Sequence, residues 1–202
     1  MERERDRLIK RENVRVCIPR YLQIGKGSLN ELPEIIKILG SIKSLLIVTD
    51  NQMVAFGYVK MLQEVLSKAG LKSDVFDDTV PDPTDTVVLQ GIKFLEKCKN
   101  DAVIGFGGGS PMDTAKAIAA MAKFSKNIQD YKPPSMFDKK GLPIIAIPTT
   151  AGTGSEVTHH AVIIDSNNNE KISCRGEGFV PIVAIVDYDL TLSKPKRLTI
   201  DS

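Results

Sequence analysis

Short apolar runs rich in β-branched residues alternate with amphipathic stretches along most of this sequence. The apolar runs predict buried strands at residues 45–49, 73–76, 102–104, 143–147 and 183–186. Between them, apolar side chains recur at helical spacing in residues 59–69, 87–98 and 111–123, with the second of these helices starting at residues 82–84. This alternation predicts an α/β fold with a Rossmann-like parallel sheet and flanking helices.

Two segments depart from the alternation. Residues 14–24 predict an extended stretch, followed by Ser28 as the N-cap of a helix over residues 29–39. Later in the chain, residues 162–164 and 171–173 flank a polar turn, which predicts a β-hairpin beside the main sheet. No linker divides the chain.

The composition excludes several classes of protein. Hydrophobic residues make up 42% and charged residues 26% of the 202, which is typical of a soluble globular protein. The net charge is only +2 and basic residues are interspersed with acids, so we expect neither nucleic acid nor membrane as a partner. Cys17, Cys98 and Cys174 are far apart, and residues 1–12 lack the apolar stretch of a signal peptide. Both features favour reduced thiols in a cytoplasmic protein.

A glycine loop of sequence Gly-Phe-Gly-Gly-Gly-Ser follows the predicted strand at residues 102–104. Its glycines let backbone N–H groups approach an anion, because no Cβ stands in the way. Ser110 is predicted to cap the next helix, and Asp113 would complete a Ser-x-x-Asp capping box. A helix N-terminus carries about half a positive charge, which suits a pyrophosphate. The loop therefore predicts a dinucleotide site, although a tight strand-to-helix turn without a ligand is the alternative.

An acidic residue about 20 positions after such a loop usually binds the ribose, but none fits here. Asp50 ends the strand at residues 45–49 and is the better candidate. A carboxylate there could accept both ribose hydroxyls and repel a 2′-phosphate, which favours NAD and leaves NADP possible. The spacing allows Asp50 equally well as the N-cap of a helix.

A second loop, residues 149–156, follows the strand at residues 143–147. It contains four hydroxyl side chains and two glycines, which is more than a turn requires. Hydroxyl groups form neutral hydrogen bonds with phosphate, ribose or carboxamide, so this loop is predicted to line the cofactor.

Three sequence blocks together resemble the iron-containing (group III) alcohol dehydrogenase family. They are Gly-Gly-Gly-Ser-Pro-Met-Asp-Thr-Ala-Lys at residues 107–116, Ile-Pro-Thr-Thr-Ala-Gly-Thr-Gly-Ser-Glu-Val-Thr at 147–158, and Val-Ala-Ile-Val-Asp-Tyr-Asp-Leu-Thr-Leu at 183–192. Their order and separations also fit, and the resemblance extends from about residue 21 to residue 202. Glycerol dehydrogenases and dehydroquinate synthases share only the glycine block.

The resemblance implies an N-terminal nucleotide-binding domain, followed in the family by an all-helical domain that carries a metal. We therefore expect residues 1–20 to form a charged tail and a first extended segment, and residues 21–202 to form the dinucleotide-binding domain. The implied reaction is reversible hydride transfer between an alcohol and an aldehyde or ketone, with NAD or NADP as cofactor and Fe²⁺ or Zn²⁺ as Lewis acid. A small alcohol or aldehyde is the expected substrate, and a homodimer is possible.

The same resemblance implies a set of cofactor-binding residues. It places Asp50 at the adenine ribose, Gly107, Gly108, Gly109 and Ser110 at the pyrophosphate, Asp113 and Lys116 on the helix beneath, Thr149, Thr150, Thr153 and Ser155 along the cofactor, and Asp82 and Lys171 on the cofactor side.

The resemblance also implies where the metal ligands should lie. In the family, a helix with a metal-binding Asp and a His four residues later follows the equivalent of residues 198–199, and two more His ligands follow. Asp201 sits slightly early and has no such His, so we expect no metal ligands, no catalytic residues and no all-helical metal domain within these 202 residues.

His159 and His160 are adjacent and should point apart, which disfavours a shared ion. Two functional hypotheses follow from these observations. The chain is either the cofactor domain of an alcohol dehydrogenase, inactive alone, or a stand-alone nucleotide-binding module. A glycerol dehydrogenase-like relative is a further alternative.

Overall fold

Six strands form one sheet in which every neighbouring pair is parallel, in the order β1-β8-β5-β4-β2-β3. The computed structural model describes residues 16–192 of the chain. The strands are β1 (Tyr21–Ile24), β2 (Ser44–Val48), β3 (Lys72–Phe76), β4 (Ala102–Gly107), β5 (Ile144–Pro148) and β8 (Val183–Val186). The central strands β4 and β5 are buried along their whole length, as parallel strands covered on both faces should be.

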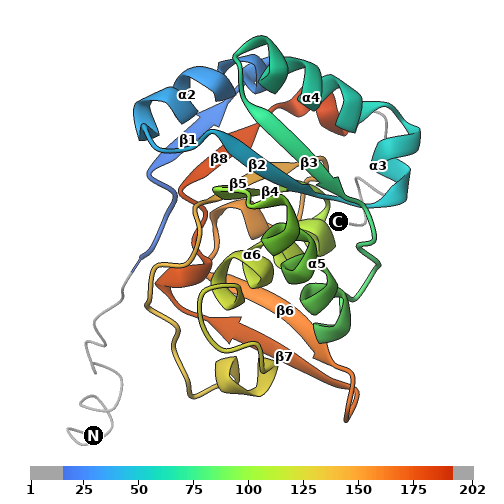
Figure 1. The fold of residues 1–202 in the computed structure, drawn as a ribbon, viewed down its shortest axis with the longest axis vertical. Helices are drawn as coiled ribbons and strands as arrows, with labels where there is room; N and C mark the ends of the chain where they lie inside the picture. Colours follow the sequence, from blue (N-terminus) through green and yellow to red (C-terminus); the bar gives the residue numbers. More distant parts are fainter. Residues whose placement is uncertain (1–15, 193–202) are drawn as a thin grey trace, which may run out of the picture.

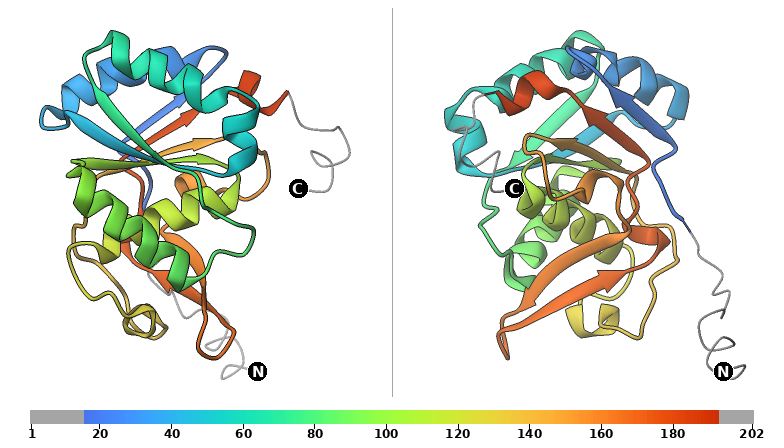
Figure 2. Two further views of the ribbon diagram at one scale, coloured as in Figure 1. Left: turned by 45° about the vertical axis from the view of Figure 1, so that its right-hand side comes forward. Right: turned by 180° about the vertical axis from the view of Figure 1, so that it is seen from behind.

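Helices cover both faces of this sheet, and a hairpin adds a further layer (Figure 1). The helices α2 (Leu32–Leu39), α3 (Asn51–Ala55) and α4 (Tyr58–Lys68) lie on one face, and α5 (Asp85–Cys98) and α6 (Gly109–Met121) lie on the other. The hairpin of β6 (His160–Asp165) and β7 (Glu170–Arg175) packs on the outer side of α6, as Figure 2 shows from two further directions. The part of the chain that the structure describes also contains short 3-10 turns: η1 (Ser28–Glu31), η2 (Ile128–Tyr131), η3 (Ser155–Val157), η4 (Glu177–Phe179) and η5 (Tyr188–Thr191).

The helix α6 lies between the sheet and the hairpin, and this position explains its sequence. Ten of its thirteen residues are buried, so it lacks the single apolar stripe of a surface helix. The small side chains of α6 and of the facing strand let the helix lie close to the sheet. A Cβ added to Gly105 of β4 would lie only 2.8 Å from the Cα of Met112. The first turn of α6 is therefore held tightly against the end of β4.

The predicted alternation of strands and helices, the parallel sheet and the hairpin are confirmed. The start of α5 also agrees with the prediction, because the Thr84 side chain caps it by accepting from the N–H of Val87 at 3.4 Å. Within residues 16–192, none of the helices combines the length and the apolar character that crossing a bilayer requires.

The predicted helix over residues 29–39, with Ser28 as its N-cap, is wrong at its start. The chain first forms η1, and α2 begins at Leu32. The N–H groups of Gly27 and Leu29 bond instead to the carboxylate of Asp187, which follows β8, at 3.0 and 3.1 Å. A partner about 160 residues away in sequence replaces the local cap.

The extended stretch predicted over residues 14–24 is shorter in the structure. Only Tyr21–Ile24 forms a strand, β1, which pairs with β8 at one edge of the sheet. Residues 14 and 15 lie outside the described part of the chain.

Candidate functional site

The loops that follow β2 and β4 meet at the carboxyl edge of the sheet. These strands are neighbours, but the chain continues from β2 to β3 on one side and from β4 to β5 on the other. Such a switch point separates the two loops and leaves a crevice, which is where open parallel sheets bind ligands. Asp50 follows β2, and a Cβ added to Gly107 at the end of β4 would lie 3.7 Å from its Oδ2 atom. The fold therefore brings Asp50 to the glycine loop.

The N-terminus of α6 opens into this crevice. Gly108 is the N-cap, and the helix begins at Gly109. The first N–H groups of a helix have no partner within it, and among the described residues nothing accepts from those of Gly109 and Ser110. Pro111 has no N–H to satisfy. Two backbone donors at the positive end of the helix dipole are thus free to bind an anion.

The predicted capping box of Ser110 and Asp113 is wrong. The helix starts one residue before Ser110 and places that residue inside its first turn, so no described side chain caps α6. The Asp113 carboxylate points away from the helix start, accepting from Ser155 Oγ at 2.7 Å and from the N–H of Val162 at 3.0 Å. Asp113 thus has the sequence position of a capping-box residue, but it bonds to residues more than 40 positions later in the chain.

The glycines of the loop have two different tasks. Gly107 has a φ of 143°, and a Cβ there would lie 2.9 Å from Pro111 Cγ, so the turn itself requires glycine. Gly108 has an extended backbone, and its Cβ would meet only the Thr150 side chain at 3.3 Å. A Cβ on Gly109 would lie 3.1 Å from Thr153 Cγ2. The absence of side chains at Gly108 and Gly109 therefore keeps open the space between the glycine loop and the threonine loop.

The threonine loop, residues 149–155, lies beside the glycine loop. The N–H of Thr149 donates to the carbonyl of Gly107 at 2.8 Å and fastens the two loops together. The Thr150 hydroxyl is buried and has no hydrogen-bond partner among the described residues. A buried hydroxyl without a partner is rare and is consistent with a polar ligand between the loops.

Asp50 performs the capping role that its position allowed, and one of its oxygens is left over for a ligand. Its Oδ1 atom accepts from the N–H groups of Gln52 and Met53, each at 3.0 Å, and so caps α3. Its Oδ2 atom lies on the side of Gly107 and remains available to a ligand. The capping interpretation is confirmed, and the ribose contact stays a prediction.

Asp82 and Lys171 form an ion pair. The Lys171 ammonium donates to Asp82 Oδ1 at 2.7 Å, and both side chains are more than half exposed. The hairpin is joined to the same segment by a backbone bond from the N–H of Ile164 to the carbonyl of Pro83 at 2.8 Å. These two residues therefore lie together, where the hairpin meets the start of α5.

Lys116 is completely buried on α6, at 0% exposure. Its ammonium donates to the carbonyls of Thr158 and His160 at 3.0 and 2.8 Å and to the Thr158 hydroxyl at 3.3 Å. Burial lowers the pKa of this ammonium to about 8, and the carboxylates of Asp113 and Glu156 oppose that effect. Burial likewise raises the pKa of Asp113 above its ordinary value, against the opposing hydrogen bonds from Ser155 and Val162. The carboxylates of Asp113 and Glu156 therefore favour the charged form of the buried Lys116.

The two histidines do not point apart as expected. His159 precedes β6, so strand alternation does not separate the pair, and the ring centroids lie 4.1 Å apart. Burial lowers the pKa of His160, and the adjacent His159 adds to this shift. Within residues 16–192, no group of three or more His, Cys, Asp or Glu side chains could hold a metal ion. Asp201 and residues 198–199 lie outside the described residues.

Two contacts at the carboxyl edge of the sheet were not predicted from the sequence. The Thr49 hydroxyl donates to the carbonyl of Phe106 at 2.8 Å and ties the ends of β2 and β4 together. Asp187 is buried and binds the loop after β1 from the end of β8. Its position at the end of a strand, like that of Asp50, was the sequence signal that could have marked it as a residue of this edge.

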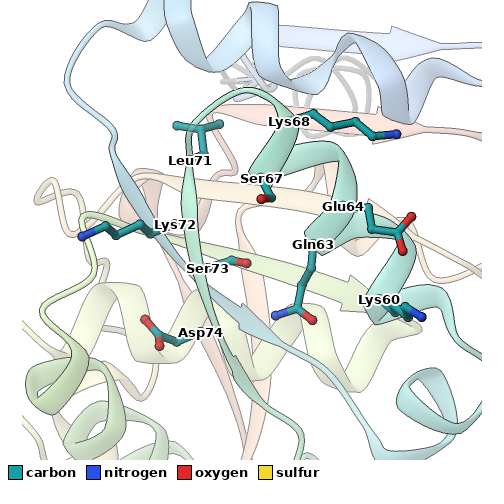
Figure 3. A pocket seen from close by; sticks show the side chains of 9 residues that line it. All are labelled: Lys60, Gln63, Glu64, Ser67, Lys68, Leu71, Lys72, Ser73 and Asp74. Atoms are coloured by element: carbon teal, nitrogen blue, oxygen red, sulfur yellow. The ribbon is translucent and has the colours of Figure 1, made fainter.

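An open groove of about 840 Å³ lies elsewhere, between α4 and the edge strand β3 (Figure 3). It is lined by Lys60, Gln63, Glu64, Ser67, Lys68, Leu71, Lys72, Ser73 and Asp74. None of the predicted cofactor-binding residues is among them, and the lining carries charges of both signs. The crevice at the carboxyl edge is therefore the better candidate site.

These features define a doubly wound α/β protein whose glycine loop and helix start lie at the switch point of the sheet. Residues 19–188 match the family model for iron-containing alcohol dehydrogenase. The chain belongs to the iron-containing alcohol dehydrogenase family, which confirms the resemblance seen in its sequence.

Individual relatives agree with this assignment. NAD-dependent methanol dehydrogenase of Bacillus methanolicus is 40% identical over 183 residues, which cover 91% of this chain and 48% of that protein. A crystal structure of a 1,3-propanediol oxidoreductase matches with a TM-score of 0.89 and 31% identity, over 93% of this chain and 49% of that one. Sulfoacetaldehyde reductase from Bifidobacterium kashiwanohense, solved in complex with NAD+, matches with a TM-score of 0.83 and 34% identity. The match covers 93% of this chain and 49% of that one. The chain thus spans about half the length of the curated relatives it matches.

Proposed function

We propose that residues 21–202 form the NAD-binding domain of a metal-dependent alcohol dehydrogenase, which interconverts an alcohol and an aldehyde or ketone. One observation carries this proposal: the free N–H groups of Gly109 and Ser110 open into the crevice between β2 and β4. Free donors at a helix N-terminus suit the diphosphate of a dinucleotide.

The neighbouring residues fit a dinucleotide. The space that a Cβ on Gly108 or Gly109 would fill is available to the diphosphate, and the unpartnered Thr150 hydroxyl faces the glycine loop across it. We assign the adenine ribose to Asp50 and the remaining length of the cofactor to the predicted wall of Thr149, Thr150, Thr153, Ser155, Asp82 and Lys171. Asp113 and Lys116 support the wall from α6.

The cofactor that we propose is NAD rather than NADP, because the Asp50 carboxylate would repel a 2′-phosphate. The methanol dehydrogenase relative is named as NAD-dependent, and the sulfoacetaldehyde reductase was solved with NAD+, which supports this choice. When bound, the nicotinamide would supply or accept the hydride. The residues of this chain would hold the cofactor in place and shield its diphosphate from water.

The metal of the family, Fe²⁺ or Zn²⁺, does not fit the described residues, since no group of three or more candidate ligands occurs among residues 16–192. We therefore assign no catalytic residue and derive no metal-assisted step. Three free cysteines support a cytoplasmic location as part of the same proposal. The exposed Leu22 and Ile24 on the edge strand β1 support a homodimer.

The proposal is tested by titrating the purified 202-residue chain with NADH in a calorimeter, and by assaying alcohol-dependent NAD reduction with added Fe²⁺ or Zn²⁺. We expect saturable NADH binding without turnover. Failure to bind NADH would contradict the cofactor site, and turnover would contradict the absence of metal ligands. An Asp-x-x-x-His motif in the gene beyond Ser202 would favour the alcohol dehydrogenase over a stand-alone nucleotide-binding module.

A further inference from the structure

Two charged side chains, the half-buried Asp113 and the fully buried Lys116, lie one helical turn apart on the side of α6 that faces the hairpin. Residues three apart on a helix share a face, so both point to the same neighbour. That neighbour is the segment of residues 155–162, which connects the threonine loop to β6.

Asp113 holds this segment at two points. Its Oδ1 atom accepts from the hydroxyl of Ser155, the last residue of the threonine loop, at 2.7 Å. Its Oδ2 atom accepts from the N–H of Val162 in β6 at 3.0 Å. Both carboxylate oxygens are thus engaged with protein groups, and both bonds run from α6 to the same segment.

Lys116 holds the middle of the segment. Its ammonium uses three hydrogen bonds on Thr158 and His160. An ammonium has three donors, so none remains for a phosphate. Among the described residues, no carboxylate lies within ion-pairing distance of it, and its acceptors are all neutral oxygens.

These bonds also explain why polar residues occupy a buried helix face. Among the described strands, β6 shares a sheet only with β7, and its other edge meets the chain before α5 at Ile164. Nearer the start of β6, the backbone groups on that edge need other partners. Asp113 satisfies the N–H of Val162, and Lys116 satisfies the carbonyl of His160. Buried backbone groups require such partners, and charged ones form stronger hydrogen bonds. The helix is therefore joined to the hairpin by fixed, directional contacts.

From this geometry we infer that Asp113 and Lys116 are positioning residues for the cofactor site, which fix the threonine loop through Ser155 and Thr158 without touching the cofactor. The inference rests on the proposed NAD site and changes the role that the family resemblance implied for both residues. Because α6 carries the glycine loop at its N-terminus, these bonds set the spacing between Gly108 and Thr150 across the diphosphate site.

The test is a double-mutant cycle on NADH affinity, measured by calorimetry with Asp113→Ala, Ser155→Ala and the double variant. We expect each single change to raise the Kd for NADH by about 10-fold, and the double variant to be no weaker than the weaker single one. Additive losses would mean that Asp113 and Ser155 affect NADH binding independently of each other, and would overturn the inference. Asp113→Asn keeps one acceptor oxygen and should bind NADH more tightly than Asp113→Ala. It replaces the alanine variant in the cycle if that variant does not fold.

Amide hydrogen exchange without NADH gives a readout that does not depend on the proposed function. Asp113→Ala and Lys116→Met should each speed exchange in residues 149–158 while β4 stays protected. Unchanged exchange there would overturn the inference even if the chain bound no NADH. Asp85→Asn is the matched control, because Asp85 accepts from the N–H of Ser166 at the hairpin tip and does not contact residues 155–162. It should change neither the exchange in residues 149–158 nor the NADH affinity.

Discussion

Replacing Gly108 with valine is expected to raise the Kd for NADH by at least about 100-fold, which corresponds to about 3 kcal/mol of binding free energy. The Cβ would point at Thr150, and the branched side chain would fill the space between the glycine loop and the threonine loop. It would also stand beside the free N–H groups of Gly109 and Ser110. The measurement is calorimetric titration with NADH, accompanied by a thermal unfolding curve.

The same variant should remain folded. Gly108 has φ −78° and ψ −164°, an extended conformation that valine adopts readily, and its Cβ would meet only a side chain. Gly105→Ala is the matched control for a glycine substitution that does disturb the fold, because its methyl group would collide with the backbone of Met112. It should cost about 1–3 kcal/mol of stability. If Gly108→Val binds NADH as tightly as the wild type, the diphosphate does not lie on this loop.

Asp50→Asn is expected to lower the preference for NADH over NADPH by about 10- to 100-fold, since it removes the negative charge that a 2′-phosphate would meet. Asparagine is as good an N-cap as aspartate, so the bonds to Gln52 and Met53 should persist. The variant therefore separates the electrostatic role of Asp50 from its capping role. The Kd values for both cofactors give the result directly.

Asp50→Gly is the companion variant, because it removes both the charge and the capping oxygen. We expect a shift toward NADPH at least as large, with only a few tenths of a kcal/mol lost from stability. An unchanged ratio of NADH to NADPH affinity in both variants would remove Asp50 from the ribose site and leave it as a cap only.

The sequence was informative where local patterns determine local structure. The apolar run that contains β2, the helical spacing of α5 and the polar turn before β7 each predicted the element found there. The order of the strands in the sheet could not be read from such patterns. It depends on the crossovers, and they place Asp50 beside Gly107 although these residues are far apart in the chain.

Polar residues show the limit of the sequence analysis. Ser28 and Ser110 both precede apolar helical stretches, yet Asp187 binds the loop before α2 and no side chain caps α6. Asp113 lies three residues after Ser110, as a capping box requires, but bonds to Ser155. Spacing along a helix cannot distinguish a local partner from one supplied by a later loop.

Lys116 illustrates the same limit for charge. A lysine within an alanine-rich helix resembles a solvent-exposed position, and the family resemblance placed it near the cofactor. Its burial follows from the hairpin that packs on α6, and the hairpin approaches closely because Lys116 and Asp113 satisfy the open edge of β6. Only the tertiary structure shows that the two features require each other.

The most direct measurement is a titration of the ¹⁵N-labelled chain with NAD+, followed through its backbone amide signals. Binding of the diphosphate at the start of α6 predicts that the amides of Gly108, Gly109 and Ser110 shift most. ADP-ribose, which retains the diphosphate, should shift the same three amides, and adenosine should not. Saturable NAD+ binding that leaves these amides unmoved would show that the cofactor lies elsewhere on the domain.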